Sequence, residues 1–298
     1  ARLDLAQLVA EGDRLAFSTD SYVIDPLFFP GGNIGKLAIC GTANDVAVSG
    51  AIPRYLSCGF ILEEGLPMET LKAVVTSMAE TARAAGIAIV TGDTKVVQRG
   101  AADKLFINTA GMGAIPANIH WGAQTLTAGD VLLVSGTLGD HGATILNLRE
   151  QLGLDGELVS DCAVLTPLIQ TLRDIPGVKA LRDATRGGVN AVVHEFAAAC
   201  GCGIELSEAA LPVKPAVRGV CELLGLDALN FANEGKLVIA VERNAAEQVL
   251  AALHSHPLGK DAALIGEVVE RKGVRLAGLY GVKRTLDLPH AEPLPRIC

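Results

Sequence analysis

The sequence predicts an α/β protein with two domains. Its 298 residues are enough for two domains of ordinary size. Half of the residues are hydrophobic but only 4% are aromatic, so we expect a core packed by small aliphatic side chains. Short apolar runs typical of strands recur between longer segments whose apolar residues follow helical spacing. Together these features favour a fold of sheets covered by helices.

The first half of the chain is expected to hold short strands and longer helices. The clearest helix is 67–86, which is amphipathic, with a proline near its start and a glycine just past its end. The segment 87–97 contains "TGDT", which predicts a strand, a turn and a second strand. The remaining elements are strands at 14–24, 54–64 and 104–115 and a helix rich in small residues at 32–51.

A turn-rich stretch at 120–130 predicts the link to the second domain, so we place the domains at 1–125 and 126–285. The second domain is expected to open with a buried strand. Its elements are strands at 131–136, 235–241 and 262–270, helices at 140–152, 162–173 and 245–256, and a strand, glycine turn and helix at 178–201.

The last residues, 286–298, have no periodicity and contain three prolines. Such a composition predicts an extended, semi-rigid and flexibly attached tail. Cys298 is its tip, and it is either an inert terminal residue or a thiol that the tail carries to a reaction.

The net charge of −8 and the isoelectric point near 5.3 argue against nucleic acid or an anionic membrane as a partner. We find no apolar run of membrane-spanning length and no signal peptide. The seven cysteines have no disulfide spacing, which favours a reducing environment. A cytoplasmic protein is therefore expected.

Three carboxylates in the first half, Asp20, Asp45 and Asp93, are candidate metal ligands. Converging carboxylates suit Mg²⁺, which prefers oxygen ligands and bridges nucleotide phosphates. Asp20 and Asp93 could instead cap turns. Asp45 lies among small apolar residues, where an unpaired charge would be costly.

Two glycine-rich turns in the second half could bind an anion at a helix start. "RDATRGG" (182–188) is either such a cradle or an ordinary turn between a strand and a helix. In "GTLGDHG" (136–142), Asp140 and His141 are interpreted as caps. Glu234, just before a predicted strand, is either a surface acid or a base held at a strand end.

Six segments together resemble the HypE family of hydrogenase maturation factors: "TDSYVIDPLFFPGGNIGKLAICGTANDVAVSGA", "ILEEG", "VTGDTKVV", "RDATRGG", "NEGKL" and the terminal "PRIC". This family belongs to the ATP-using superfamily of aminoimidazole ribonucleotide synthetase. The resemblance implies the two-domain fold of that superfamily, with an N-terminal domain that forms a homodimer through its sheet. It also implies that ATP and Mg²⁺ bind between the domains.

The resemblance implies roles for individual residues. Asp20, Asp45 and Asp93 would hold the metal. Asn44, Thr94 and Lys95 would lie at the phosphates, and Asp183 would face the nucleotide. The family also has a glycine-rich segment before the first strand. We find no equivalent in the sequence given, so nucleotide binding is expected to be weakened.

The implied reaction uses the tail. The carbamoyltransferase HypF would load a carbamoyl group onto Cys298, and ATP would drive its dehydration to a thiocyanate. Lys95 would neutralise phosphate charge and Glu234 would act as the base. The HypC–HypD complex would accept the cyanide. The alternatives are a small-molecule kinase or ligase of the same superfamily, and a carrier scaffold without enzymatic activity.

Overall fold

The computed structural model describes residues 1–3, 5–154, 158–289 and 294–298. The chain divides into two compact units. Unit 1 comprises Ala1–Ile119, Cys162–Thr166 and Arg296–Cys298, and unit 2 comprises His120–Asp161 and Pro167–Pro295. Two short segments from the second half of the sequence therefore fold with the first unit.

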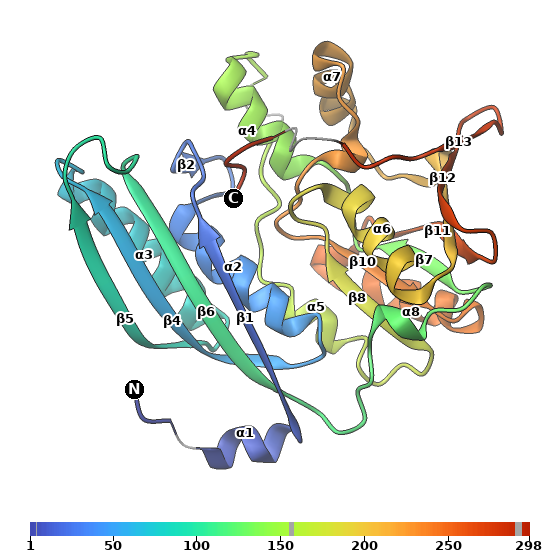
Figure 1. Cartoon of the computed structure of the whole chain (residues 1–298), viewed down its shortest axis with the longest axis horizontal. Helices are drawn as coiled ribbons and strands as arrows, with labels where there is room; N and C mark the ends of the chain where they lie inside the picture. The colour runs from blue at the N-terminus through green and yellow to red at the C-terminus, as the bar shows by residue number, and fades with distance from the viewer. Residues whose placement is uncertain (4, 155–157, 290–293) are drawn as a thin grey trace. The chain divides into compact units, whose positions relative to one another are not determined.

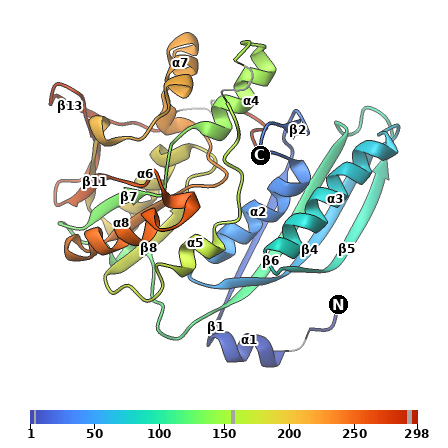
Figure 2. The same cartoon turned by 180° about the vertical axis from the view of Figure 1, so that it is seen from behind.

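Unit 1 is a sheet with helices on one face. Within the described residues its four-stranded sheet has the order β1-β6-β4-β5, in which β4 and β5 run parallel and the other pairs antiparallel. Figures 1 and 2 show α2 and α3 on the same face of this sheet. The elements are α1 (Leu5–Glu11), β1 (Arg14–Tyr22), β2 (Phe28–Phe29), β3 (Gly32–Asn33), α2 (Ile34–Ala47), β4 (Ile52–Glu63), α3 (Met68–Ala84), β5 (Ala88–Val97) and β6 (Leu105–Ile115).

The capping and packing of helix α2 account for its many small residues. The side chain of Asn33 accepts hydrogen bonds from the backbone N–H groups of Gly35 and Lys36, which caps the helix start. Nearly every residue of α2 is buried, because the helix packs against the sheet strands β1 and β6 and also against α3. Its glycine, alanine and threonine residues are small enough for this close packing. A wider side chain at Gly35 would meet the backbone oxygen of Val74 in α3, which is why a glycine stands there.

The other face of the unit 1 sheet exposes apolar side chains. Leu15, Phe17 and Ile61 are 61%, 68% and 44% exposed. Side chains alternate between the two faces of a strand, and the neighbours Ala16 and Leu62 are buried on the helix side. This face is therefore available for packing against another surface.

Unit 2 is built on a mixed sheet. In the part of the chain that the structure describes, seven strands follow the order β13-β12-β9-β11-β7-β10-β8. Every residue of β7 and β10 is buried, so both faces of the sheet centre are covered. The strands are β7 (Val131–Val134), β8 (Val178–Asp183), β9 (Gly203–Ser207), β10 (Leu237–Val241), β11 (Ala263–Val269), β12 (Gly273–Ala277) and β13 (Lys283–Thr285).

Among the described residues of unit 2, four helices lie within predicted helical segments and one was not indicated by the sequence. The unpredicted one is α7 (Pro215–Leu224), an amphipathic helix that begins with a proline. The others are α4 (Asp140–Glu150), α5 (Thr166–Gln170), α6 (Gly188–Cys200) and α8 (Ala246–His254). Short 3₁₀ turns are η1 (Ala123–Thr125), η2 (Glu208–Ala210), η3 (Ala228–Asn230), η4 (Arg243–Ala245) and η5 (Pro257–Gly259).

Three expectations about local structure need correction. Residues 88–97 form one continuous strand, because "TGDT" pairs with β4 along its whole length instead of turning. The helix expected at 162–173 is limited to Thr166–Gln170, since Cys162–Thr166 folds with unit 1. The expected tail, 286–298, includes residues 290–293, which lie outside the described residues. Beyond them, Leu294, Ile297 and Cys298 are buried.

No helix among the described residues is both long enough and apolar enough to cross a membrane.

Candidate functional site

Two of the three predicted metal ligands, Asp20 and Asp45, lie on the helix side of the unit 1 sheet. The hydroxyl of Ser18 in β1 donates to a carboxylate oxygen of Asp45 in α2 at 2.8 Å. Asp20 follows Ser18 by two residues in the same strand, so both side chains point to the helix side of the sheet. Asp20 therefore lies on the same face as the Ser18–Asp45 contact, two residues further along β1.

Asp93 does not join them within the chain. Ladder pairing aligns Ser21 with Asn108, Asn108 with Gly59, and Gly59 with Asp93. Three strand spacings separate Asp93 from β1, which is about 14 Å. Asp93 also shares its face with Ser21 and not with Asp20. Among the described residues, no group of three or more His, Cys, Asp or Glu side chains could hold a metal ion. The predicted three-carboxylate cluster is therefore not formed within this chain.

Asp93 pairs with Lys95 on the surface. The Lys95 ammonium lies 2.8 Å from the Asp93 carboxylate, and the side chains are 69% and 68% exposed. Hydrogen bonds from Lys95 and from the backbone N–H of Thr94 lower the pKa of Asp93. Asp93 is thus a strand residue with its own cation, and the turn-cap interpretation was wrong.

Asn44 has a structural partner in unit 1. Its amide nitrogen donates to the backbone oxygen of Ala163 at 3.0 Å, and its amide oxygen accepts from the backbone N–H of Leu165 at 2.8 Å. The side chain is 1% exposed. Asn44 therefore holds the segment 162–166 against α2.

In unit 2, the side chain of Asn233 bridges the two glycine-rich turns at 136–142 and 182–188. The amide oxygen of Asn233 accepts from the backbone N–H of Gly139 at 2.8 Å, and its amide nitrogen donates to the backbone oxygen of Ala184 at 3.0 Å. Asp183 ends β8, pairs with Leu237 of β10 and is 4% exposed. The glycine-rich loops and the "NEGK" loop therefore meet at one edge of the sheet.

A buried ion pair at this edge escaped the sequence analysis. Asp161 accepts hydrogen bonds from the backbone N–H groups of Glu234 and Gly235 and lies 3.1 Å from the Lys236 ammonium. Burial alone would raise the pKa of Asp161, but the charges of Lys236 and His141 and the hydrogen bonds hold it below its usual value. Because 73 residues separate Asp161 from Glu234, no local pattern could indicate this contact.

Glu234 is buried, with 2% exposure, so the surface interpretation was wrong. Its backbone is fixed by Asp161, which sets the position of the loop. Nearby loop residues are also engaged. Asp140 accepts from Thr137 at 2.5 Å and from Lys214 at 3.0 Å, and His141 lies 2.7 Å from the Ser160 hydroxyl.

The terminal thiol lies against unit 1. Cys298 is 7% exposed, and its backbone oxygen accepts from the N–H of Val23 at 2.9 Å. The C-terminus lies beside β2 in both views (Figures 1 and 2). All seven cysteines are described, and none is in a disulfide.

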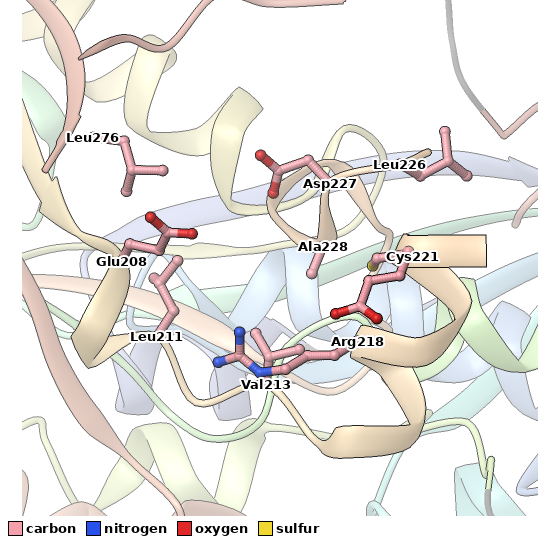
Figure 3. Close-up of a pocket in the computed structure, with 10 residues that line it drawn as sticks. Glu208, Leu211, Val213, Arg218, Cys221, Leu226, Asp227, Ala228 and Leu276 are labelled. Atoms are coloured by element: carbon pink, nitrogen blue, oxygen red, sulfur yellow. The ribbon is translucent and has the colours of Figure 1, made fainter. Parts of the chain in front are cut away.

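A separate cavity of about 250 Å³ lies in unit 2 beside α7. Figure 3 shows four of the residues that line this cavity: Arg218 and Cys221 from α7, and the acidic residues Glu208 and Asp227. Burial raises the pKa of Cys221 to about 11, so this thiol is protonated at neutral pH. None of the predicted site residues lines this cavity.

Comparison with known proteins places these features in one family. The AIR synthase related protein N-terminal domain matches residues 3–115, and the AIR synthase related protein C-terminal domain matches residues 127–278. A Rhodobacter capsulatus protein named carbamoyl dehydratase HypE is 50% identical over 100% of this chain and 88% of its own length. The chain belongs to the HypE family. The predicted family and two-domain fold are thereby confirmed.

Solved structures of HypE proteins match this chain over 92% to 100% of its length. The crystal structure of E. coli HypE matches with a TM-score of 0.99 and 98% identity, covering 100% of this chain and 92% of that one. A HypE structure in complex with ATP is 46% identical with a TM-score of 0.94, covering 100% and 89%. A HypE–HypF complex is 48% identical with a TM-score of 0.90, covering 92% and 90%.

Proposed function

We propose that this protein is an ATP-dependent carbamoyl dehydratase that acts on its own C-terminal cysteine in hydrogenase maturation. The observation that carries the proposal is the 50% identity to a protein named carbamoyl dehydratase over the full chain, Cys298 included. An enzyme that phosphorylates a free small molecule has no use for a terminal thiol.

The reaction balances as a dehydration coupled to ATP hydrolysis. The S-carbamoyl form of Cys298 and ATP give the thiocyanate of Cys298, ADP and inorganic phosphate. The carbonyl oxygen leaves on the phosphate, and both amide protons are released as the nitrile forms. The amide therefore needs an activated oxygen and a proton acceptor.

Glu234 is the proposed proton acceptor. Its carboxyl is buried, and the Asp161 hydrogen bond to its backbone holds the loop that carries it. A base held in place by its loop is already oriented toward the reacting proton, so less entropy is lost when the proton is transferred. Asp161 and Lys236 would act as positioning residues for Glu234.

Asp20 and Asp45 are the proposed magnesium ligands. Mg²⁺ is usually held by one or two carboxylates together with substrate phosphates, so this pair is sufficient. Bound ATP would supply the phosphoryl group that activates the amide oxygen, and Mg²⁺ would neutralise charge on its phosphates. Support for nucleotide binding comes from the related HypE structure that contains ATP.

Further residues are proposed to contact the nucleotide. Lys95 follows Thr94 on β5 and pairs with Asp93. Its ladder partner is Ile61, so it lies on the sheet face opposite Asp20 and Asp45 and would reach the nucleotide from the second copy in the proposed homodimer. Asp183 ends β8 in unit 2. Asn44 would act indirectly, since both ends of its amide are bound to the segment 162–166.

Partners follow from the same proposal. HypF would load Cys298, as a related HypE–HypF complex suggests. The HypC–HypD complex would accept the cyanide. A homodimer would bury the uncovered sheet face with Leu15, Phe17 and Ile61, and the protein would act in the cytoplasm.

The test follows the mass of the C-terminal peptide. Cys298 is loaded by HypF and carbamoyl phosphate, the protein is separated from nucleotide and partner, and ATP is then added to half of the sample. We expect the peptide to lose the mass of one water only when ATP is present. The Glu234→Gln variant should load normally and keep the carbamoyl group.

The same experiment separates the alternatives. If the adduct forms but never loses water with ATP bound, the protein is a carrier scaffold. If no adduct forms on Cys298, and the Cys298→Ser variant still consumes ATP with a free substrate, the protein is a kinase or ligase of the superfamily.

A further inference from the structure

The last three residues occupy a defined place on unit 1. Val23, just after β1, binds this segment twice: its N–H donates to the oxygen of Cys298 at 2.9 Å, and its oxygen accepts from Nε of Arg296 at 2.8 Å. Ile297 between them is 2% exposed. The segment is therefore held by one backbone hydrogen bond, by one hydrogen bond from the Arg296 side chain and by the buried Ile297 side chain.

Arg296 adds the charged contact. Its guanidinium donates to the carboxylate of Asp103 at 2.7 Å and lies 5.9 Å from the ring centre of Phe106 in β6. The φ angle of Arg296 is 53°, in the left-handed region that residues other than glycine rarely adopt. An unfavourable backbone angle of this kind persists where surrounding contacts determine it, and here Arg296 supplies three of them.

The docked position shields the thiol. Cys298 is only 7% exposed, and a loading enzyme must reach its sulfur to form a bond. Docking therefore has to be reversible in a protein whose terminal thiol is loaded by a separate partner. The backbone bond from Val23 to Cys298 is available to any sequence, whereas the bonds to the Val23 oxygen and to Asp103 depend on the arginine side chain.

We propose that Arg296 is a positioning residue: its bonds to Asp103 and Val23 hold the C-terminal thiol docked, and their release exposes Cys298 for loading. The role in loading rests on the proposed function, but the docking equilibrium does not. The charged pair is 37% and 42% exposed, so salt weakens it. Lys104, 4.0 Å from Asp103, pairs more closely with Asp25 at 2.7 Å and leaves Asp103 to the arginine.

The test measures how fast iodoacetamide alkylates Cys298, read as the mass of the C-terminal peptide. Charge-assisted bonds from a guanidinium fork are among the stronger hydrogen bonds, so Arg296→Gln should raise the rate about ten-fold. Asp103→Asn should raise it by a similar factor. The double variant should be no faster than the faster single variant, because both remove one interaction. High salt should speed the unchanged protein and not the variants.

Arg243→Gln is the matched control, since it removes an arginine from a surface ion pair with Glu267 in unit 2 and should leave the rate unchanged. Cys58 in β4 reports unfolding of unit 1. Burial raises the pKa of its thiol to about 11, so its alkylation should stay slow in every variant.

Equal Cys298 rates in the unchanged protein and Arg296→Gln would overturn the proposal. So would a rate that rises in Arg296→Gln but not in Asp103→Asn, with Cys58 still protected. The assay needs neither ATP nor a partner. If alkylation responds as expected while loaded Cys298 never loses water, the docking role stands and the proposed dehydratase activity fails. If both stand, HypF should load Arg296→Gln faster than the unchanged protein.

Discussion

Each unit of the molecule contains an aspartate–lysine pair, and the two pairs differ in their surroundings. Asp93 and Lys95 in unit 1 are 2.8 Å apart with 68% and 69% of their side chains exposed. Asp161 and Lys236 in unit 2 are 3.1 Å apart with 3% and 11% exposed. The two distances are similar, but the first pair is exposed to water and the second is buried.

Exposure decides what each pair does for the fold. An exposed ion pair gains little because water and salt screen it, so Asp93 and Lys95 are available to a ligand. A buried carboxylate that loses its partners leaves uncompensated charges in the interior. Asp161 also accepts two backbone N–H groups, so it determines the path of the loop with Glu234. We infer that the buried pair, Asp161 and Lys236, fixes the loop that carries Glu234. The exposed pair, Asp93 and Lys95, contributes little to stability and can contact a ligand.

The largest expected effect is on stability. Asp161→Asn should lower the free energy of unfolding of unit 2 by about 3 kcal/mol, because Lys236 is left buried without its counter-charge. The chain's one tryptophan, Trp121, lies in unit 2, so its fluorescence in a urea titration reports this unfolding. Asp93→Asn is the matched control and should leave the urea midpoint unchanged. Equal midpoints for the two variants would contradict the comparison.

The second prediction concerns pH. The folded-state pKa of Asp161 is below its usual value, so its charge stabilises the fold above the unfolded pKa of about 4 and ceases to do so as pH falls through the folded value. The stability difference between the unchanged protein and Asp161→Asn should therefore be constant near neutral pH and shrink in acid. Urea midpoints of both proteins across acidic pH measure it. A difference that grew on acidification would have the wrong sign.

The smallest expected effect on stability belongs to Lys95→Gln. Because the lysine is 69% exposed, the thermal midpoint should stay the same. ATP-dependent loss of water from loaded Cys298 should nevertheless slow about ten-fold or more, if Lys95 neutralises phosphate charge as proposed. The peptide-mass assay measures the rate, with Lys72→Gln on α3 as a surface control. An unchanged rate would remove Lys95 from the proposed site.

Much of the fold could be predicted from the sequence. Periodicity located β1, β4, β6 and α3 within a few residues, because their buried residues recur with regular spacing, and a run of small residues after a glycine–asparagine start located α2. The turn expected at Asp93 failed for a physical reason. A side chain at Gly92 would meet the backbone oxygen of Cys58 at 2.3 Å, so the glycine allows close strand pairing and does not mark a turn.

The site was less predictable, because its contacts are distant in sequence. Glu234 and Asp183 were predicted as site residues, but nothing in the local sequence "VSDCAV" indicated a role for Asp161. Its partners lie 73 to 75 residues away, and only the fold brings them together. Cys298 was predicted as the tip of a flexible arm, whereas its contacts with Val23 are visible only in three dimensions.

The most direct measurement avoids the loading partner. Cyanate adds to thiols to give the same carbamoyl group, so Cys298 can be loaded chemically and excess reagent removed. ATP is then added while the infrared spectrum is followed in the region of the nitrile stretch, where protein absorbs little. A nitrile band that grows only with ATP, and is missing from Cys298→Ser, is the result we predict. A loaded Cys298 that keeps its carbamoyl group while ATP is hydrolysed would contradict the proposed dehydration.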